Sequence, residues 1–445
     1  MQRLRFLNTA VTALVAALFG LVLAAQPARA LSLLRDSDIE YALTQLATPV
    51  LKAAGLSPSQ VKILVIDDPN LNAFVVDRDN IFIHAGLLQR ATTADMLQAI
   101  IAHEAAHISN GHLARRRLNA RSAKTAAGLG MALGIAAAAV TGTGAAAAAG
   151  LGAANSAMRL YFAHTRAEET SADASAIRFM INAGLHPQGM VDLLELFRGQ
   201  DVLSEARQDP YARTHPMTSD RYRTMRAYAD AHTKPRTNTA EANYFFARAK
   251  GKLSAFLRSP KWTLTRAGEF GYPDVEAMRK AVAYHRQSQT SKAVAEIDRA
   301  ISLRPNDPFY RDLKGQILFE ARQFGPAAAA YAAAAKMAPR DPLILGSYGR
   351  ALLATGQTRA ALDVLERSRQ RDGRDARVMR DLGQAYAKLG QTGMASVVTA
   401  ERYALQGKFK DAAIHAKRAS DLLPRGSGPW NRAQDVLSAA KDAAQ

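Results

Sequence analysis

The stretch that decides the fold of the first half of the chain is TTADMLQAIIAHEAAHISNGH, residues 92–112. Thr92, followed three residues later by Asp95, is typical of a helix start, and apolar residues then recur at helical spacing. We expect one long helix that continues to about residue 117. Its apolar flanks predict that it is buried, so the His-Glu-Ala-Ala-His run at 103–107 lies in a core and needs a reason to be there.

The spacing within this run indicates a metal site. Four residues correspond to about 400° of helix rotation, so His103 and His107 lie one turn apart on nearly the same face and can bind one zinc ion. Glu104 lies about 100° round the helix, where its carboxylate can reach a water molecule on the metal. This is the ligand, base, ligand order of a metallopeptidase helix. A chance occurrence on a solvated helix is the alternative, and the predicted burial disfavours it.

A catalytic zinc ion needs a third protein ligand, and the chain offers two sources. One is His112, which lies about 140° from His107 on a continuous helix and is therefore expected to support a ligand or to lie on the helix surface. The other is Glu169, one turn before Asp173. Glu169 can bind the ion while Asp173 accepts a hydrogen bond from a ligand imidazole. Glu168 competes with Glu169 but has no acidic partner one turn later.

The first thirty residues predict export. Arg3 and Arg5 precede an apolar run, and Ala-Arg-Ala at 28–30 is typical of a cleavage site, so we expect cleavage after Ala30 and a periplasmic protein. An uncleaved anchor is the alternative, but the run is shorter than the roughly 20 residues that span a bilayer. Removing residues 1–30 takes away three arginines and no acid, so the net charge falls from +19 to +16. Export and the absence of a nucleic-acid-binding motif exclude nucleic acid as a partner, whereas a basic surface favours transient contact with anionic membranes.

At 445 residues the chain is long enough for two or three domains, and its 48% hydrophobic and 22% charged residues are typical of a globular protein. A helix is expected at 36–54, followed by strands at 61–66, 73–76 and 81–83 in a small antiparallel sheet. The Ala/Gly-rich stretch 125–158 is expected to form a helical hairpin that lies near the metal site and contacts the membrane. A buried core hairpin and a membrane insertion are the alternatives.

The second half shows a repeat of 34 residues. Pro-Asn-Asp-Pro at 305–308 recurs as Pro-Arg-Asp-Pro at 339–342 and, less well kept, as Gly-Arg-Asp-Ala at 373–376. Small residues keep the same spacing at Gly315, Gly349 and Gly383 and at Ala293, Ala327, Ala361 and Ala395. This pattern resembles the tetratricopeptide repeat, in which paired helices approach closely at small residues. We therefore expect an α-solenoid that binds protein partners.

The first half resembles a known family. His103-Glu104-x-x-His107 with Glu169-x-x-Ala172-Asp173 looks like the gluzincin peptidases that include HtpX and the prenyl-protein endopeptidases, and in particular their exported members with tetratricopeptide repeats. Further matches are Leu71-Asn72-Ala73-Phe74, Asn110-Gly111-His112 and Thr214-His215-Pro216 with Arg221. The resemblance implies peptide-bond hydrolysis with one zinc ion per chain as Lewis acid and Glu104 as base.

Two roles are implied less directly by the same resemblance. His215 either stabilises the negative charge on the substrate oxygen or caps the zinc ion in a resting state, with a loop-shaping role as the alternative. Arg221 is expected to pair with an acidic residue near the site. Separately from the resemblance, strand addition as a general mode of peptide binding suggests that the strand at 73–76 binds the substrate backbone.

The expected architecture is mainly α. A signal at 1–30 precedes a zincin-like metallopeptidase domain of helices and a small antiparallel sheet at 31–258, a hinge at 259–272 and tetratricopeptide repeats at 273–445. We expect an exported zinc endopeptidase that cleaves misfolded or misassembled envelope proteins and binds its substrates and envelope assembly proteins through the repeats. The alternative is a periplasmic chaperone or assembly scaffold with a latent peptidase centre.

Overall fold

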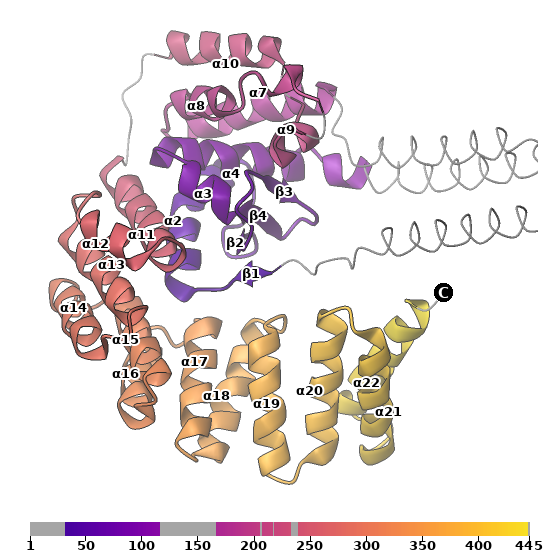
Figure 1. Cartoon of the computed structure of the whole chain (residues 1–445). Helices are drawn as coiled ribbons and strands as arrows, with labels where there is room; N and C mark the ends of the chain where they lie inside the picture. Colours follow the sequence, from indigo (N-terminus) through magenta and orange to yellow (C-terminus); the bar gives the residue numbers. More distant parts are fainter. Residues whose placement is uncertain (1–31, 116–165, 205–206, 217, 233–238, 444–445) are drawn as a thin grey trace, which may run out of the picture. The chain divides into compact units, whose positions relative to one another are not determined.

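The chain is described by a computed structural model that covers residues 32–115, 166–204, 207–216, 218–232 and 239–443 (Figure 1). The predicted export signal at 1–30 and the predicted hairpin at 125–158 lie outside these residues. Among the helices that are described, none combines the length and the apolar character required to cross a bilayer.

A four-stranded sheet forms one layer of the first half, in the order β1-β2-β4-β3. The strands are β1 (Leu33–Leu34), β2 (Lys62–Ile66), β3 (Ala73–Val75) and β4 (Asn80–His84). The outer pairs are antiparallel, but β2 and β4 are parallel, so the expectation of a wholly antiparallel sheet is wrong in this respect. The reason is that β3 pairs only with β4: the hairpin places β4, and not β3, beside β2.

Helix α4 (Ala94–Ser109) is the central element of the first half and lies between the sheet and the helices above it (Figure 1). It contacts β3 and β4 as well as α2 (Ser37–Ala53), α7 (Arg166–Asn182) and α8 (Gln188–Leu196). These contacts bury Leu97, Ile100 and Ile101 completely. The remaining elements here are α3 (Ala85–Arg90), the 3-10 helix η1 (Gln200–Val202), α9 (Pro210–Thr214) and α10 (Ser219–Ala231).

Both ends of α4 differ from the expectation. Thr93, and not Thr92, caps the helix, because its hydroxyl accepts the backbone N–H of Met96 at 3.1 Å. At the other end α4 stops at Ser109 rather than near residue 117. Gly111 adopts a φ of +72°, a left-handed conformation that ends a helix and redirects the chain. His112 therefore does not follow the rotation of α4.

The second half is an array of paired helices, as predicted, and this confirms the α-solenoid (Figure 1). Each helix packs against the next along the chain. The helices are α13 (Pro273–His285), α14 (Thr290–Leu303), α15 (Pro308–Glu320), α16 (Phe324–Met337), α17 (Pro342–Ala354), α18 (Thr358–Arg371), α19 (Ala376–Lys388), α20 (Thr392–Leu405), α21 (Phe409–Leu422) and α22 (Gly428–Asp442).

Close approach between paired helices explains two of the repeated glycines. A Cβ atom at Gly315 would lie 2.7 Å from the ring of Tyr331, and one at Gly349 would lie 2.5 Å from the side chain of Leu365. Both distances are too short for any side chain to fit without moving the partner helix. The repeated Asp-Pro pair also has a local function, because Asp307 and Asp341 cap α15 and α17 through their side chains.

Helix α11 (Thr239–Leu257) joins the two halves, since it packs on both α2 and α13. The predicted hinge at 259–272 contains the short helix α12 (Pro260–Thr265). Arg279 of α13 is fully buried and donates to the carbonyl oxygen atoms of Arg266 and Ala267 at 2.6 and 3.0 Å, which fixes the turn that follows α12.

Buried ion pairs connect the first half to the repeats. The guanidinium of Arg248 in α11 pairs with Asp38 of α2 and with Asp307, whose Oδ1 lies 2.9 Å from Nη2. Lys252, one turn later, places Nζ 2.9 Å from Oδ1 of Asp36. Because a buried charge without a partner strongly destabilises a fold, these pairs fix the register of α2, α11 and α15.

The stability of this junction is expected to depend on pH through Asp312 of α15. Its Oδ2 accepts the hydroxyl of Ser37 at 2.7 Å, and burial raises its pKa from the ordinary 3.8 to about 7. Between these two values the folded chain holds one more proton than the unfolded chain, so the free energy of unfolding falls as the pH rises from about 4 to about 7.

Asp312→Asn removes this ionisation and is expected to raise the free energy of unfolding at pH 8 by roughly 1–3 kcal/mol, with little gain at pH 4. Urea unfolding at the two pH values measures the difference. Asp298→Asn, at a half-exposed acid of α14 that pairs with Lys314, is the control and should not change the pH dependence. If wild type and Asp312→Asn respond identically to pH, the buried acid is not the cause.

Candidate metal centre

Two imidazoles of α4 face one point in the core. His103 and His107 lie one helical turn apart, and their Nε2 atoms are 3.1 Å from each other. Both side chains are completely buried. The residues around them have small side chains, the alanines at 99, 102, 105 and 106, so other elements can approach α4 closely.

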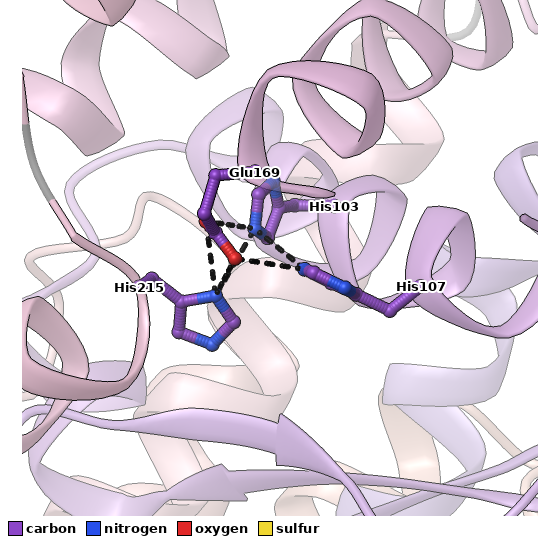
Figure 2. A group of neighbouring side chains, drawn as sticks. All are labelled: His103, His107, Glu169 and His215. Atoms are coloured by element: carbon purple, nitrogen blue, oxygen red, sulfur yellow. Dashed lines mark hydrogen bonds and ion pairs between the residues drawn. The ribbon is translucent and has the colours of Figure 1, made fainter. Parts of the chain in front are cut away.

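A carboxylate from α7 completes a group of three. Oε2 of Glu169 lies 3.2 Å from Nε2 of His103, and Oε1 lies 3.4 Å from Nε2 of His107. Glu168 is directed elsewhere, and its Oε1 is 3.7 Å from Nη1 of Arg115. Of the two glutamates weighed from the sequence, it is therefore Glu169 that meets the imidazole pair (Figure 2).

His215, which directly follows α9, joins the same group (Figure 2). Its Nδ1 lies 3.1 Å from Oε1 of Glu169 and 3.3 Å from Nε2 of His103. One ligand atom from each of His103, His107, Glu169 and His215 lies within 4.8 Å of the other three. Of the two roles considered for His215, this placement is the one that capping a metal ion requires.

The outer nitrogen of each imidazole is engaged by another group. Nδ1 of His103 lies 3.0 Å from Oδ1 of Asp173, and Nδ1 of His107 lies 2.9 Å from Nδ1 of His112. Nε2 of His215 lies 3.4 Å from the carbonyl oxygen of Ala73. If these outer nitrogens carry the protons, all three inner nitrogens direct lone pairs at the Glu169 carboxylate.

Such a cluster of lone pairs suits a cation. Burial alone would raise the pKa of Glu169, but interactions with His215 and His103 hold it well below its ordinary value, so the carboxylate is ionised in the core. Despite burial, Glu169 and Asp173 raise the pKa of His103 to about 10, so a bound cation would take the place of the proton on this imidazole. Burial lowers the pKa of His107 well below 6.5, which keeps this imidazole neutral. Three imidazole nitrogens and one carboxylate oxygen are a donor set that Zn²⁺ accepts in tetrahedral geometry. The residues present therefore fit a zinc ion.

His112 reaches His107 because the helix ends between them. On a continuous helix the two residues would be about 140° apart, as the sequence analysis assumed. The left-handed turn at Gly111 instead brings the two rings to a centroid distance of 5.0 Å. His112 was expected either to support a metal ligand or to lie on the helix surface. The structure places it in the first of these positions, beside His107.

Arg221 of α10 binds both carboxylates of α7. Its Nε and Nη2 lie 2.6 and 2.8 Å from the two oxygens of Asp173, and Nη1 lies 3.0 Å from Oε2 of Glu169. Nη1 also donates to the carbonyl oxygen of Pro216 at 2.9 Å, which ties the segment after His215 to the cluster. The sequence predicted an acidic partner for Arg221, and the structure shows that there are two.

Glu104 lies beside the cluster without belonging to it. Its carboxylate is fully buried, and Oε1 is 3.5 Å from Nε2 of His215. Tyr211 is a further neighbour that the sequence pattern did not predict, and its ring stacks on His215 at a centroid distance of 4.4 Å. The signal was an aromatic residue one helical turn before His215, directly after Pro210, which starts a helix.

Asp173→Asn is expected to weaken zinc binding about 10- to 100-fold, because the amide can donate to Nδ1 of His103 and so favour the tautomer whose Nε2 carries the proton. Competition with a chromophoric chelator measures the affinity. Asp220→Asn, at an exposed acid next to Arg221 in the chain, is the control and should bind zinc as the wild type does. Unchanged affinity in Asp173→Asn would show that Asp173 does not orient the imidazole.

Comparison with known proteins identifies relatives that carry similar names. The chain is 26% identical over 265 residues to a Vibrio cholerae protein named "Putative beta-barrel assembly-enhancing protease". The aligned residues cover 56% of this chain and 52% of the relative. It is 24% identical over 218 residues to the beta-barrel assembly-enhancing protease of Escherichia coli K12, covering 49% and 44%. The chain thus spans about half the length of the curated relatives it matches.

A solved structure of YrrB, a TPR protein, matches with a TM-score of 0.32 and 17% identity, over 40% of this chain and 91% of that one. The assignment of the repeats rests instead on the helix pairs themselves. The first half gives the clearer match, because residues 34–229 align with a single family over nearly all the elements that build the cluster. This part of the chain matches peptidase family M48.

Proposed function

We propose that the chain is a zinc-dependent endopeptidase. The observation that carries the proposal is the buried group of His103, His107 and Glu169 with the carboxylate of Glu104 beside it. Two imidazoles and one carboxylate are the protein ligands of a catalytic zinc site, and a neighbouring carboxylate is the base that such a site needs. The match of the first half to peptidase family M48 supports the same reaction.

Each residue of the site has a separate role in hydrolysis. Zn²⁺, when bound, would polarise the carbonyl of a peptide bond and lower the pKa of a water molecule. The Glu104 carboxylate takes a proton from the attacking water and passes it to the amine nitrogen as the carbon–nitrogen bond breaks. Asp173 and His112 hold the two imidazoles of α4 in orientation, and Arg221 holds Glu169 and Asp173 together.

The edge of the sheet offers a place for the substrate backbone. Within the described part of the chain, strand β3 pairs with β4 on one side only and is one of the two edge strands of the sheet. The carbonyl oxygen of Ala73, its first residue, lies 3.4 Å from Nε2 of His215. A peptide that pairs with β3 as an additional strand would therefore pass beside the cluster, which favours extended, unfolded polypeptides as substrates.

The repeats and the predicted export signal support a cellular location for the enzyme. We place it in the periplasm, after cleavage at Ala30, where misfolded or misassembled envelope proteins are its substrates. The repeat array binds these substrates and envelope assembly proteins, and the basic surface permits transient contact with anionic membranes. The names of the matched relatives support a function in the assembly of β-barrel proteins.

A latent centre is the second candidate state, and His215 favours it. A catalytic zinc ion keeps one position for water, whereas a fourth protein ligand closes the site. With Nδ1 of His215 3.3 Å from Nε2 of His103, the chain supplies four donors. We infer that this is a resting arrangement and that His215 moves away when substrate binds, so a scaffold with a silent centre and an active peptidase can be two states of one protein.

Glu104→Gln tests the reaction. The amide cannot take a proton from water, so cleavage of casein by the mature protein is expected to fall by about 10²–10⁴-fold while zinc content and unfolding temperature stay at wild-type values. A chelator should abolish wild-type cleavage, and added Zn²⁺ should restore it. Full activity in Glu104→Gln would rule out the proposed mechanism.

His215→Ala tests latency. Removing a fourth donor while three remain is expected to keep zinc bound and to raise kcat for an unfolded substrate, because water gains a position on the ion. Metal analysis and steady-state kinetics on the same preparation provide both values. A fall in kcat with zinc retained would instead assign His215 to the stabilisation of charge on the substrate.

A further inference from the structure

Tyr211 contacts both the segment before the edge strand and the cluster. Its backbone N–H donates to the carbonyl oxygen of Leu71 at 3.2 Å, just before β3, and its own carbonyl accepts the N–H of His215 at 2.7 Å. Its ring is stacked between those of Phe197 and His215, with centroid distances of 4.7 and 4.4 Å. The ring centroid of His103 is 6.5 Å away. The backbone of Tyr211 is therefore tied to the segment just before β3, and its ring packs directly against His215, one of the residues proposed to bind zinc.

The hydroxyl of Tyr211 has no hydrogen-bond partner among the residues that the structure describes, although the residue is fully buried. Buried tyrosines normally place this group against a donor or acceptor, because a buried hydroxyl without a partner destabilises the fold. Tyr310 shows the normal case: it too is fully buried, and its hydroxyl donates to Oδ2 of Asp274 at 2.8 Å.

A phenol hydroxyl in its ordinary neutral form is a hydrogen-bond donor. A neutral donor beside a reacting centre is the kind of group that stabilises negative charge as it develops on an oxygen atom.

We propose that the hydroxyl of Tyr211 donates a hydrogen bond to the carbonyl oxygen of the peptide bond that is cleaved. This inference rests on the proposed endopeptidase function. Glu104 acts on the attacking water, so the carbonyl oxygen is the reacting atom that still lacks a donor from the protein when His215 has moved away. Tyr211 is then a catalytic residue whose partner belongs to the substrate.

Tyr211→Phe removes the hydroxyl and keeps the stacked ring. We expect kcat for casein-derived peptides to fall by about 10- to 10³-fold with KM nearly unchanged, because the hydrogen bond strengthens only as charge develops. Binding of a phosphinic peptide, which carries a tetrahedral anionic group, should weaken by a comparable factor. Zinc affinity should not change, and the urea midpoint should stay level or rise, because an unpartnered buried hydroxyl has been removed.

Tyr310→Phe is the matched control in the repeats. It removes a hydroxyl that has a partner, so it should lower the urea midpoint and leave kcat and phosphinic-peptide binding at wild-type values. An unchanged kcat in Tyr211→Phe would overturn the proposal. So would a fall in kcat accompanied by a lower urea midpoint or a lower zinc affinity, since the hydroxyl would then act through the fold.

The two proposals fail differently. If the wild type cleaves no better than Glu104→Gln, the endopeptidase function is wrong and the assignment of Tyr211 is wrong with it. If the wild type cleaves and Tyr211→Phe cleaves equally well, only the assignment of Tyr211 is wrong.

Discussion

The buried negative charge of Glu169 is the constraint on which the first half depends. An ionised carboxylate in a core must be compensated, and here imidazoles from α4 and α9 and the guanidinium of Arg221 surround it. That requirement brings α4, α7, α9 and α10 to one point. The same compensation that makes the centre electrostatically acceptable also collects the donors of a metal site, so stability and chemistry are not separate properties of this fold.

The central chemistry could be predicted from local spacing because it depends on helix geometry alone. Two helix residues four positions apart lie on nearly the same face, as His103 and His107 do. Glu169 and Asp173 follow the same rule. His112 could not be placed in this way, because its position depends on the backbone of Gly111, which the helical pattern of the flanking residues concealed. The parallel pairing of β2 with β4 was missed for a related reason: which strand lies beside β2 leaves no trace in the alternation of side chains along each strand.

In the repeats, the period was visible but the partners were not. Gly315 and Gly349 recur because Tyr331 and Leu365 press against them, and a fixed spacing reveals such a requirement. The ion pairs of Arg248 join residues far apart in the chain, with Asp38 more than two hundred positions away. No local pattern marks such a contact, so a sequence can predict that an array of helices exists without showing what anchors it to its neighbour.

The ion pair between Arg248 and Asp307 limits how independently the two halves can be exchanged. Asp307 stabilises the first turn of α15 and at the same time neutralises Arg248, a cation seated in the helix that precedes the array. The boundary suggested by the sequence, between 259 and 272, would separate these charges. An exchange of one array for another at that point would remove Asp307 and leave the buried guanidinium of Arg248 with Asp38 as its remaining acidic partner. The unit that can be moved intact therefore extends at least through α15, the third helix of what the sequence marks as the repeats.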